Sequence, residues 1–342
     1  MGSCAMLLKT LFLTGLLVMG AAGACLAAPY QAPRTPDGQP DLQGAWANTT
    51  LTQLERPKGF AGLYATPAEA AAHIQKVLDQ VNNVPPPVKP GDPPPKPNIG
   101  QSEWYDAGVG LMRIDGKLRS SMITDPSDGK LPYNFLGSRA VRDADRRDEA
   151  VTQDPEDRNS DERCLMASGS ALTPPMLPPV YNARYEIIQT HDAVVIETEM
   201  VHDIRIISLG GHHEGRGPKW FGDSVGHWEG DTLVVETVDQ DPISADRFLP
   251  GSILHLTPAA KVTERFTRTG PGEIRYGFTV VDPAVFTRPW SGEVVFTSTA
   301  QPLYEYACHE GNYALLNILR GARREDAEAA RKAVSVTPAA KP

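Results

Sequence analysis

The sequence predicts a mainly β protein built around an antiparallel, lipocalin-like up-and-down barrel, with a β-sandwich as the alternative. Three observations predict this fold class. From residue 181 onward short segments alternate apolar and polar residues, glycine and aspartate turns separate them, and eight such segments follow one another. Alternation with period two is typical of antiparallel strands that have one solvated face. Closing eight such strands into a barrel removes the exposed edges of the sheet.

The alternation is clear in residues 261–269, where Val262 and Phe266 share one face and Arg265 lies on the other. Gly230-Asp231 is predicted to form the tight turn between two neighbouring strands, which makes the following residues part of a hairpin. The eight predicted strands are residues 185–190, 193–199, 203–208, 226–229, 232–237, 261–269, 273–281 and 292–297.

Further elements are predicted at the periphery of the barrel. Gly44-Ala45-Trp46 fits a short first strand, since Gly-x-Trp is common in lipocalin-like barrels, where the tryptophan closes one end. Thr66-Pro67-Ala68-Glu69 is a capping-box sequence, and it predicts an N-terminal helix over residues 66–80. An apolar stripe predicts a C-terminal helix over residues 312–334.

The chain between these elements is expected to be less regular. Asp115-Gly116 is a strong hairpin signal between residues 111–114 and 117–124, and residues 126–129 form a second turn. Residues 139–163 are densely charged without an apolar period, which predicts a loop or a frayed helix.

Four segments follow from these patterns. The proline-rich residues 84–98 are predicted to form an extended surface connector. The predicted boundaries are 1–28 for a signal peptide, 29–83 for an N-terminal strand and helix, 84–98 for the connector, and 99–342 for the barrel domain with its C-terminal helix.

The N-terminus has the layout of a secretory signal peptide. Lys9 precedes an apolar run over residues 11–20, and small residues follow as far as Ala28. The apolar run is short for a transmembrane anchor. We therefore expect cleavage near Ala28 and a periplasmic or secreted protein, with lipoprotein anchoring at Cys25 as the alternative.

The charge balance excludes one class of partner. The formal net charge is −9 at pH 7, from 33 Lys and Arg against 42 Asp and Glu. Nucleic-acid binding requires clustered Lys and Arg, so nucleic acid is not expected as a partner. No later stretch is apolar enough to predict a transmembrane segment.

The cysteines agree with export. If Cys4 and Cys25 are removed with the signal peptide, Cys164 and Cys308 remain. Two cysteines in an oxidising compartment predict one disulfide, and closing so long a loop stabilises the folded chain by roughly 4–5 kcal/mol in the chain-entropy estimate. A metal-binding pair or a catalytic thiol is the alternative.

The densest polar stretch, residues 210–237, contains most of the candidate site residues. Its first half is a glycine-rich loop that holds His212 and His213, and Trp220, Asp223 and His227 follow. Loops positioned by a rigid barrel are frequent functional sites. Gly222-Asp223-Ser224 resembles the serine motif of secreted esterases, but the nucleophile elbow of hydrolases is absent from the sequence.

Two other clusters could converge with this loop. Asp203 and Arg205 share one face of a predicted strand, which favours a buried ion pair in the lumen. His309 and Glu310 follow Cys308, so a disulfide would hold them rigidly. A rigid histidine beside a carboxylate suits general acid–base catalysis, although both residues could instead cap the helix that follows.

A divalent metal is a further possibility. His212, His213, His227 and His309 are ligands of the kind that zinc accepts, but no recognised metal-binding spacing connects them. We therefore predict neither an organic cofactor nor a metal.

Several runs together resemble a family of exported bacterial proteins that has no assigned activity, and the resemblance covers nearly the whole chain. The runs are Pro40-Asp41-Leu42-Gln43-Gly44-Ala45-Trp46, Leu54-Glu55-Arg56-Pro57, Met122-Ile123-Thr124-Asp125-Pro126-Ser127-Asp128-Gly129, Arg163-Cys164-Leu165, residues 222–235 (GDSVGHWEGDTLVV) and residues 305–313 (EYACHEGNY). The resemblance implies export and one continuous unit. Members of the family more often have Arg-Pro-His where this chain has Gly211-His212-His213, which favours His213 over His212 as a site residue.

These patterns predict a periplasmic, cofactor-independent enzyme that acts by general acid–base chemistry on a small, partly apolar molecule, as a hydrolase, lyase or isomerase. The alternatives are a non-catalytic lipocalin-like ligand-binding protein, a metal-dependent hydrolase, and an envelope protein that binds other proteins through its proline-rich connector. The predicted catalytic residues are His309, Glu310, Asp223 and His227, and the predicted substrate-binding residues are His213, Arg205, Trp220 and Asp203.

Overall fold

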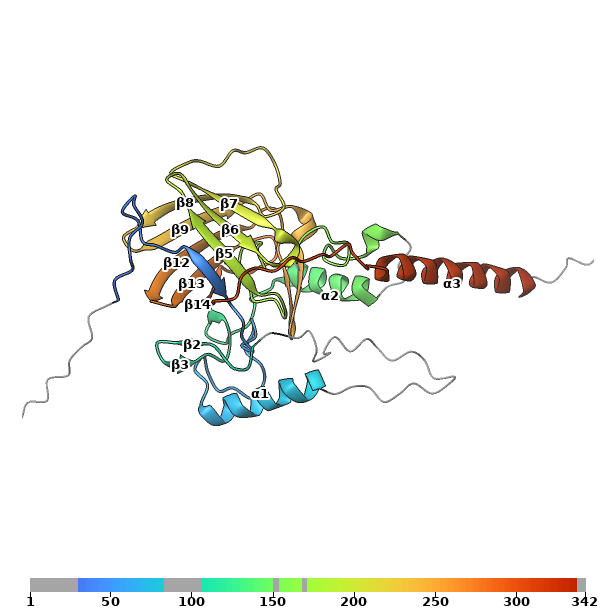
Figure 1. Cartoon of the computed structure of the whole chain (residues 1–342). Helices are drawn as coiled ribbons and strands as arrows, with labels where there is room; N and C mark the ends of the chain where they lie inside the picture. Colours follow the sequence, from blue (N-terminus) through green and yellow to red (C-terminus); the bar gives the residue numbers. More distant parts are fainter. Residues whose placement is uncertain (1–29, 83–105, 107, 150–153, 168–170, 337–342) are drawn as a thin grey trace, which may run out of the picture. The chain divides into compact units, whose positions relative to one another are not determined.

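The computed structural model describes residues 30–82, 106, 108–149, 154–167 and 171–336 (Figure 1). The described residues from Gln31 onward belong to one compact unit. The predicted signal peptide, Cys4, Cys25 and the proline-rich connector lie outside the described residues. No helix in the described part of the chain is long and apolar enough to span a lipid bilayer.

Among the described residues, nine strands form a closed barrel, in the order β1-β5-β6-β7-β8-β9-β12-β13-β14 (Figure 1). Closure comes from β1, which pairs with β5 on one side and with β14 on the other. The strands are β1 (Gly44–Ala47), β5 (Arg184–Gln189), β6 (Ala193–Thr198), β7 (Ile204–Leu209), β8 (Asp223–Glu229), β9 (Thr232–Val238), β12 (Lys261–Gly270), β13 (Glu273–Val281) and β14 (Trp290–Ser298). The short strand β4 (Ile123–Asp125) also pairs with β14.

The predicted barrel is confirmed, and each of the eight predicted strands corresponds to one strand of the structure. The short first strand at Gly44-Ala45-Trp46 is also confirmed, as β1. The prediction of a wholly antiparallel barrel is wrong, because β7 and β8 run parallel, with Ser208 opposite Val225.

The parallel strands β7 and β8 require a crossover connection, whereas antiparallel neighbours can be joined by a short turn. The chain must return along the sheet before β8 begins, and residues 210–222 make this crossover. At its end, Gly222 has a φ of +74°, and an added Cβ would lie 2.5 Å from Thr237 Cγ2 and 2.8 Å from the Val238 carbonyl oxygen. Glycine at this position therefore allows the crossover to approach β9 closely.

The interior of the barrel is a packed core. Trp46 is buried at one end, where its Nε1 donates to the Leu42 carbonyl and the Arg268 guanidinium lies over the indole. Residues 171–177 are also buried, and Met176 and Leu177 belong to the same core cluster as the barrel side chains. Other buried members include Tyr185, Ile187, Ile196, Ile207, Val235, Val262, Phe266, Tyr276, Phe278, Trp290 and Phe296.

The peripheral elements begin and turn as their sequences predict. Helix α1 (Pro67–Asn82) follows a capping box, in which Glu69 N donates to Thr66 Oγ1 and Thr66 N donates to Glu69 Oε2. Strands β2 (Arg113–Ile114) and β3 (Lys117–Leu118) form the predicted hairpin. Asp115 and Gly116 both have positive φ angles, as its tight turn requires.

Of the two predictions for residues 139–163, a loop or a frayed helix, the helix is correct for the first part, which belongs to helix α2 (Phe135–Glu149). Asn134 caps this helix by accepting a hydrogen bond from Gly137 N, and Arg139 pairs with Asp143 one turn later. The predicted C-terminal helix is confirmed as α3 (Ala314–Val336). The remaining elements are β10 (Asp246–Leu249), β11 (Ser252–His255) and the 3₁₀ turns η1 (Pro155–Asp157), η2 (Met200–His202) and η3 (Pro242–Ser244).

The predicted disulfide is present. The Sγ atoms of Cys164 and Cys308 lie 2.06 Å apart, and the two residues are separated by 144 positions in the sequence. The bond therefore ties the segment that precedes α3 to the segment that precedes the buried residues 171–177.

Replacing Gly222 with alanine tests the close approach of the crossover. Gly210 is the matched control, because it also has a positive φ (+67°) but no atom within 4 Å of its added Cβ. We expect Gly210→Ala to cost about 1 kcal/mol from backbone strain alone, and Gly222→Ala to cost roughly 3 kcal/mol or more because of the clash. Urea denaturation measures both values, and equal losses would contradict the close-approach role.

Candidate functional site

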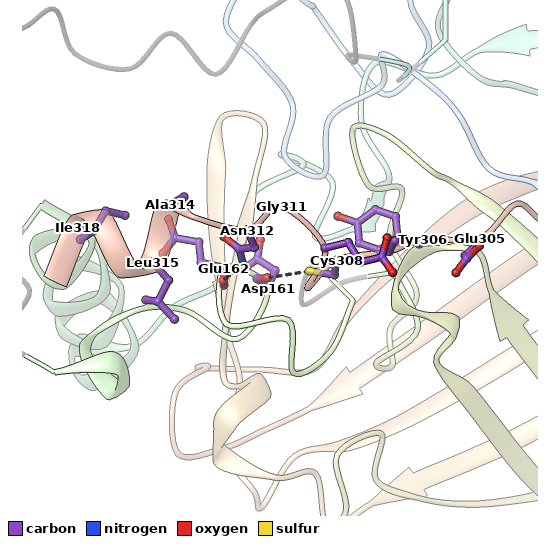
Figure 2. A pocket seen from close by; sticks show the side chains of 12 residues that line it. Asp161, Glu162, Glu305, Tyr306, Cys308, Gly311, Asn312, Ala314, Leu315 and Ile318 are labelled. Atoms are coloured by element: carbon purple, nitrogen blue, oxygen red, sulfur yellow. Dashed lines mark hydrogen bonds between the residues drawn. The ribbon is translucent and has the colours of Figure 1, made fainter. Parts of the chain in front are cut away.

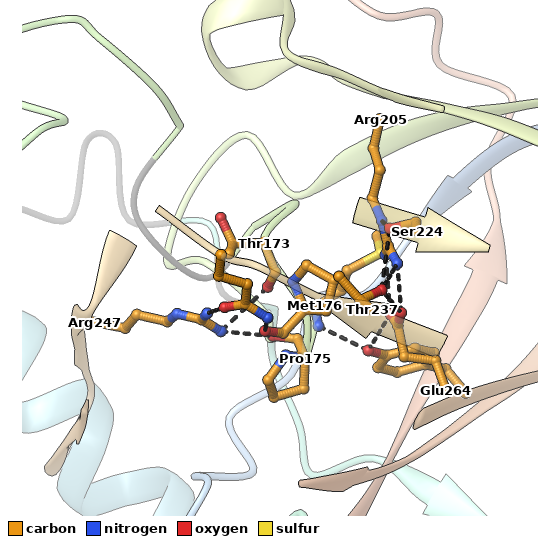
Figure 3. Close-up of polar contacts among 11 residues, drawn as sticks. Thr173, Pro175, Met176, Arg205, Ser224, Thr237, Arg247 and Glu264 are labelled. Atoms are coloured by element: carbon orange, nitrogen blue, oxygen red, sulfur yellow. Dashed lines mark hydrogen bonds and ion pairs between the residues drawn. The ribbon is translucent and has the colours of Figure 1, made fainter. Parts of the chain in front are cut away.

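Arg205 lies in the barrel interior, and its ion-pair partner there is Glu264 (Figure 3). The two side chains are 1% and 0% exposed. The guanidinium donates to both oxygens of Glu264, to Thr237 Oγ1 at 2.9 Å and to Ser224 Oγ at 3.1 Å. Because its charge is paired and it does not reach solvent, Arg205 is not placed to bind a substrate.

The predicted pairing of Asp203 with Arg205 is wrong. Asp203 precedes β7, and its Oδ2 accepts a hydrogen bond from Ala167 N at 2.5 Å. Burial raises the pKa of Asp203 to about 6, although the hydrogen bond from Ala167 acts in the opposite direction. Asp203 therefore fixes the chain near Cys164 and does not face the lumen.

A second arginine extends the interior polar network (Figure 3). Arg247 is fully buried and donates to Gln240 Oε1 at 2.6 Å and to the Thr173 carbonyl at 3.2 Å. Met176 N donates to the Tyr276 hydroxyl at 2.8 Å, and that hydroxyl donates to Glu264 Oε1 at 2.8 Å. Arg247 thus holds residues 171–177 directly, and Arg205 is linked to them through Glu264 and Tyr276. The segment fills the inside of the barrel, where a lipocalin-like carrier would hold its ligand.

His213 on the crossover lies beside Asp223, the first residue of β8. Asp223 Oδ2 accepts from Glu214 N at 2.7 Å, and Lys219 Nζ lies 3.1 Å from Asp223 Oδ1. His213 Nδ1 lies 3.6 Å from Asp223 Oδ2, and its Nε2 lies 3.4 Å from Glu236 Oε1. Burial raises the pKa of Asp223, but the bonds from Glu214 and Lys219 outweigh burial and lower it. This network fastens the crossover to β8 and β9.

His227 and Trp220 do not join that network. His227 is exposed on β8, and its Nε2 lies 3.2 Å from Glu229 Oε1, while Oε2 of the same glutamate pairs with Arg265. Trp220 is exposed on the crossover. Within the described residues, no hydrogen bond or ion pair connects His213, His227 and His309, and His213 and His227 pair with different carboxylates.

A pocket of about 470 Å³ lies beside the disulfide (Figure 2). One wall is formed by Asp161 and Glu162, close to Cys164, and the other by residues from 305 to 318. Asn312 Nδ2 donates to the Glu162 carbonyl at 3.2 Å and so holds the walls together with the disulfide. The lining residues are Asp161, Glu162, Glu305, Tyr306, Ala307, Cys308, Glu310, Gly311, Asn312, Ala314, Leu315 and Ile318.

Of the predicted catalytic pair, Glu310 lines this pocket and His309 does not. Both side chains are exposed. Among the described residues, His309 has no side-chain hydrogen bond or ion pair that would orient its ring. The pocket is acidic, since its lining includes four carboxylates and no basic side chain.

The turn around η2 positions the wall that carries Tyr306. The buried Glu199 accepts from Tyr304 N at 3.1 Å through Oε2, and it pairs with Arg184 through Oε1. His202 Nε2 accepts from Tyr306 N at 3.1 Å, which requires the tautomer with the proton on Nδ1. Side chains from one turn of the barrel therefore fix the chain that leads into the pocket.

The shortest histidine–carboxylate contact of the described chain was not predicted from the sequence. His255 Nδ1 lies 2.6 Å from Asp246 Oδ1, and Arg147 from α2 binds the other oxygen of Asp246. Burial raises the pKa of Asp246, but hydrogen bonds from His255 and Arg147 outweigh burial and lower it. The signal that could have revealed the pair is Pro250-Gly251, because a turn there places residues 246 and 255 opposite each other.

The described residues contain no group of three or more His, Cys, Asp and Glu side chains placed to hold a metal ion. Comparison with models of known protein families gives no match, and comparison with curated proteins finds no similar sequence.

The raised pKa of Asp203 predicts a pH-dependent stability. The folded chain binds this proton more tightly than the unfolded chain, so Asp203 favours folding most below about pH 4, and this contribution is lost as the pH rises through about 6. Asp203→Asn keeps an oxygen for Ala167 N but removes the titration. We expect wild type to gain stability relative to this variant as the pH falls from about 7 to about 4. Urea midpoints measured across that range test this, and parallel profiles would contradict it.

Proposed function

We propose that the protein binds a small organic cation with an apolar part in the pocket beside the disulfide. The observation that carries this proposal is the composition of the pocket wall, which combines carboxylates with Tyr306, Leu315 and Ile318. Its volume of about 470 Å³ lies in the range of small-molecule sites. The packed barrel interior supports the same conclusion. Side chains fill the inside of the barrel, so a ligand is expected to bind on its outside.

The charges of the pocket favour a cationic ligand. Arg158 already binds Glu162 through two hydrogen bonds of 2.7 Å, whereas Glu305 and Glu310 are exposed and make no ion pair within the described chain. An ammonium group near Glu305 and Glu310 would be attracted by both, and the apolar part of the ligand would contact Leu315 and Ile318.

We further propose that this binding occurs in the periplasm. The disulfide supports the proposal, since such bonds form and persist in oxidising compartments.

A pair of probes with the same phenylethyl group and opposite charge tests the ligand class. We expect phenethylammonium to bind and to shift the NMR signals of Ala307 and Ala314, and 3-phenylpropanoate to bind far more weakly. Glu305→Gln with Glu310→Gln should weaken phenethylammonium binding roughly 2- to 30-fold, because each of the two exposed charge pairs contributes about 0.2–1 kcal/mol.

Glu325→Gln on the exposed side of α3 is the control, and it should leave the affinity unchanged. Equal affinity for the two probes, or an undiminished affinity in the double variant, would contradict the proposed site.

A second candidate function is the general acid–base enzyme predicted from the sequence, with His255 in place of His309 as its acid or base. The contact of 2.6 Å with Asp246 favours this candidate, because a carboxylate that accepts from Nδ1 orients the ring and leaves Nε2 for proton transfer. No hydrogen bond engages Nε2 within the described part of the chain.

Hydrolysis of p-nitrophenyl acetate tests this candidate. We expect His255→Ala to lower turnover at least about 100-fold, the usual contribution of a positioned acid or base. His227→Ala, which removes an exposed histidine, should have little effect. Equal effects of the two substitutions would show that no positioned histidine is responsible.

A further inference from the structure

The outer wall of the barrel carries an apolar row that crosses three neighbouring strands. Ile188 of β5 lies opposite Val195 of β6, and Val195 lies opposite Ile206 of β7. Ile204 lies two residues before Ile206 and faces the same side. Ile188, Ile204 and Ile206 are 44%, 51% and 61% exposed. Contiguous apolar side chains on a surface are typical of an interface.

Two carboxylates lie beside this row. Glu186 is directly opposite Glu197, and Glu197 is directly opposite Ile204. Like charges in directly opposite positions of a sheet repel each other. Neither glutamate makes an ion pair within the described residues. The wall patch is our name for these two glutamates together with Ile188, Val195, Ile204 and Ile206. A partner that fits the wall patch must present apolar side chains beside positive charges.

Helix α3 presents such a surface. Leu316, Arg320 and Arg323 are spaced i, i+4 and i+7, so they share one face of the helix. Leu316 is 44% exposed, both arginines are exposed, and neither arginine has an ion-pair partner in the described chain. The pocket uses different side chains, Leu315 and Ile318.

We propose that the protein forms a dimer in which the Leu316–Arg320–Arg323 face of α3 docks on the wall patch of a second copy. Leu316 contacts the isoleucines, and the two arginines bind Glu186 and Glu197. The exchange is reciprocal, with each copy giving its helix and receiving the other, so the contact closes under a two-fold axis. It relieves the repulsion between the paired glutamates and covers the apolar row.

Sedimentation equilibrium over a wide concentration range tests the dimer. We expect wild type to dimerise, and Ile206→Asp to be monomeric. Val109→Asp places the same charge at another highly exposed aliphatic position and should leave the dimer intact. Arg320→Glu with Arg323→Glu should abolish dimerisation, whereas Arg142→Glu with Arg146→Glu, which makes the same charge change on α2, should not.

Charge exchange gives the decisive variant. Glu186→Arg with Glu197→Arg, combined with Arg320→Glu and Arg323→Glu, should restore the dimer, because opposite charges again face each other. A wild type that is monomeric at every concentration overturns the proposal. A dimer that persists in both the Ile206→Asp variant and the arginine-reversal variant also overturns it. The same holds if the charge-exchanged variant stays monomeric.

Discussion

The buried ion pair between Arg205 and Glu264 is the interaction on which the rest of the barrel depends. Arg205 comes from β7, Ser224 from β8, Thr237 from β9 and Glu264 from β12, and all meet at one guanidinium. Tyr276 adds β13 and relays the network to residues 171–177. A buried charge is costly unless it is paired and fully hydrogen-bonded. The pair therefore constrains five strands and the segment that fills the barrel.

The same constraint explains much of the run GDSVGHWEGDTLVV. Gly222 permits the close approach of the crossover, Asp223 fastens it, and Ser224 turns inward to Arg205. Gly226 lies where an added Cβ would meet Ile207 at 2.9 Å, so it allows the parallel strands to pack. Gly230 turns the hairpin with a φ of +60°. The glycines and polar residues of this run therefore stabilise the crossover, the parallel pair and the hairpin. His227 has no part in these contacts, since it is exposed and pairs separately.

The sequence predicts the barrel and its eight main strands because alternation and turn residues are local signals. It does not predict the parallel pair, since no local pattern distinguishes a crossover from a long hairpin loop. Glu264 stands on the apolar face between Val262 and Phe266, and a carboxylate in a core position requires a cation. Which arginine supplies it depends on tertiary contacts, and adjacency in sequence wrongly favours Asp203. The disulfide is predicted correctly, because an exported chain with two cysteines has one possible pairing. The pair of His255 and Asp246 depends on the hairpin β10–β11, which the sequence pattern did not reveal.

The stability of Glu264→Gln tests most directly whether the barrel interior is a closed core anchored by this pair. The substitution keeps the shape of the side chain but leaves the Arg205 charge buried and uncompensated. We predict a loss of about 3–5 kcal/mol in the free energy of unfolding, as for a broken buried pair. Arg265→Met, which breaks an exposed pair with Glu229, should cost less than about 1 kcal/mol. A similarly small loss for Glu264→Gln would contradict a closed core, since it would mean that Arg205 reaches solvent in an open lumen.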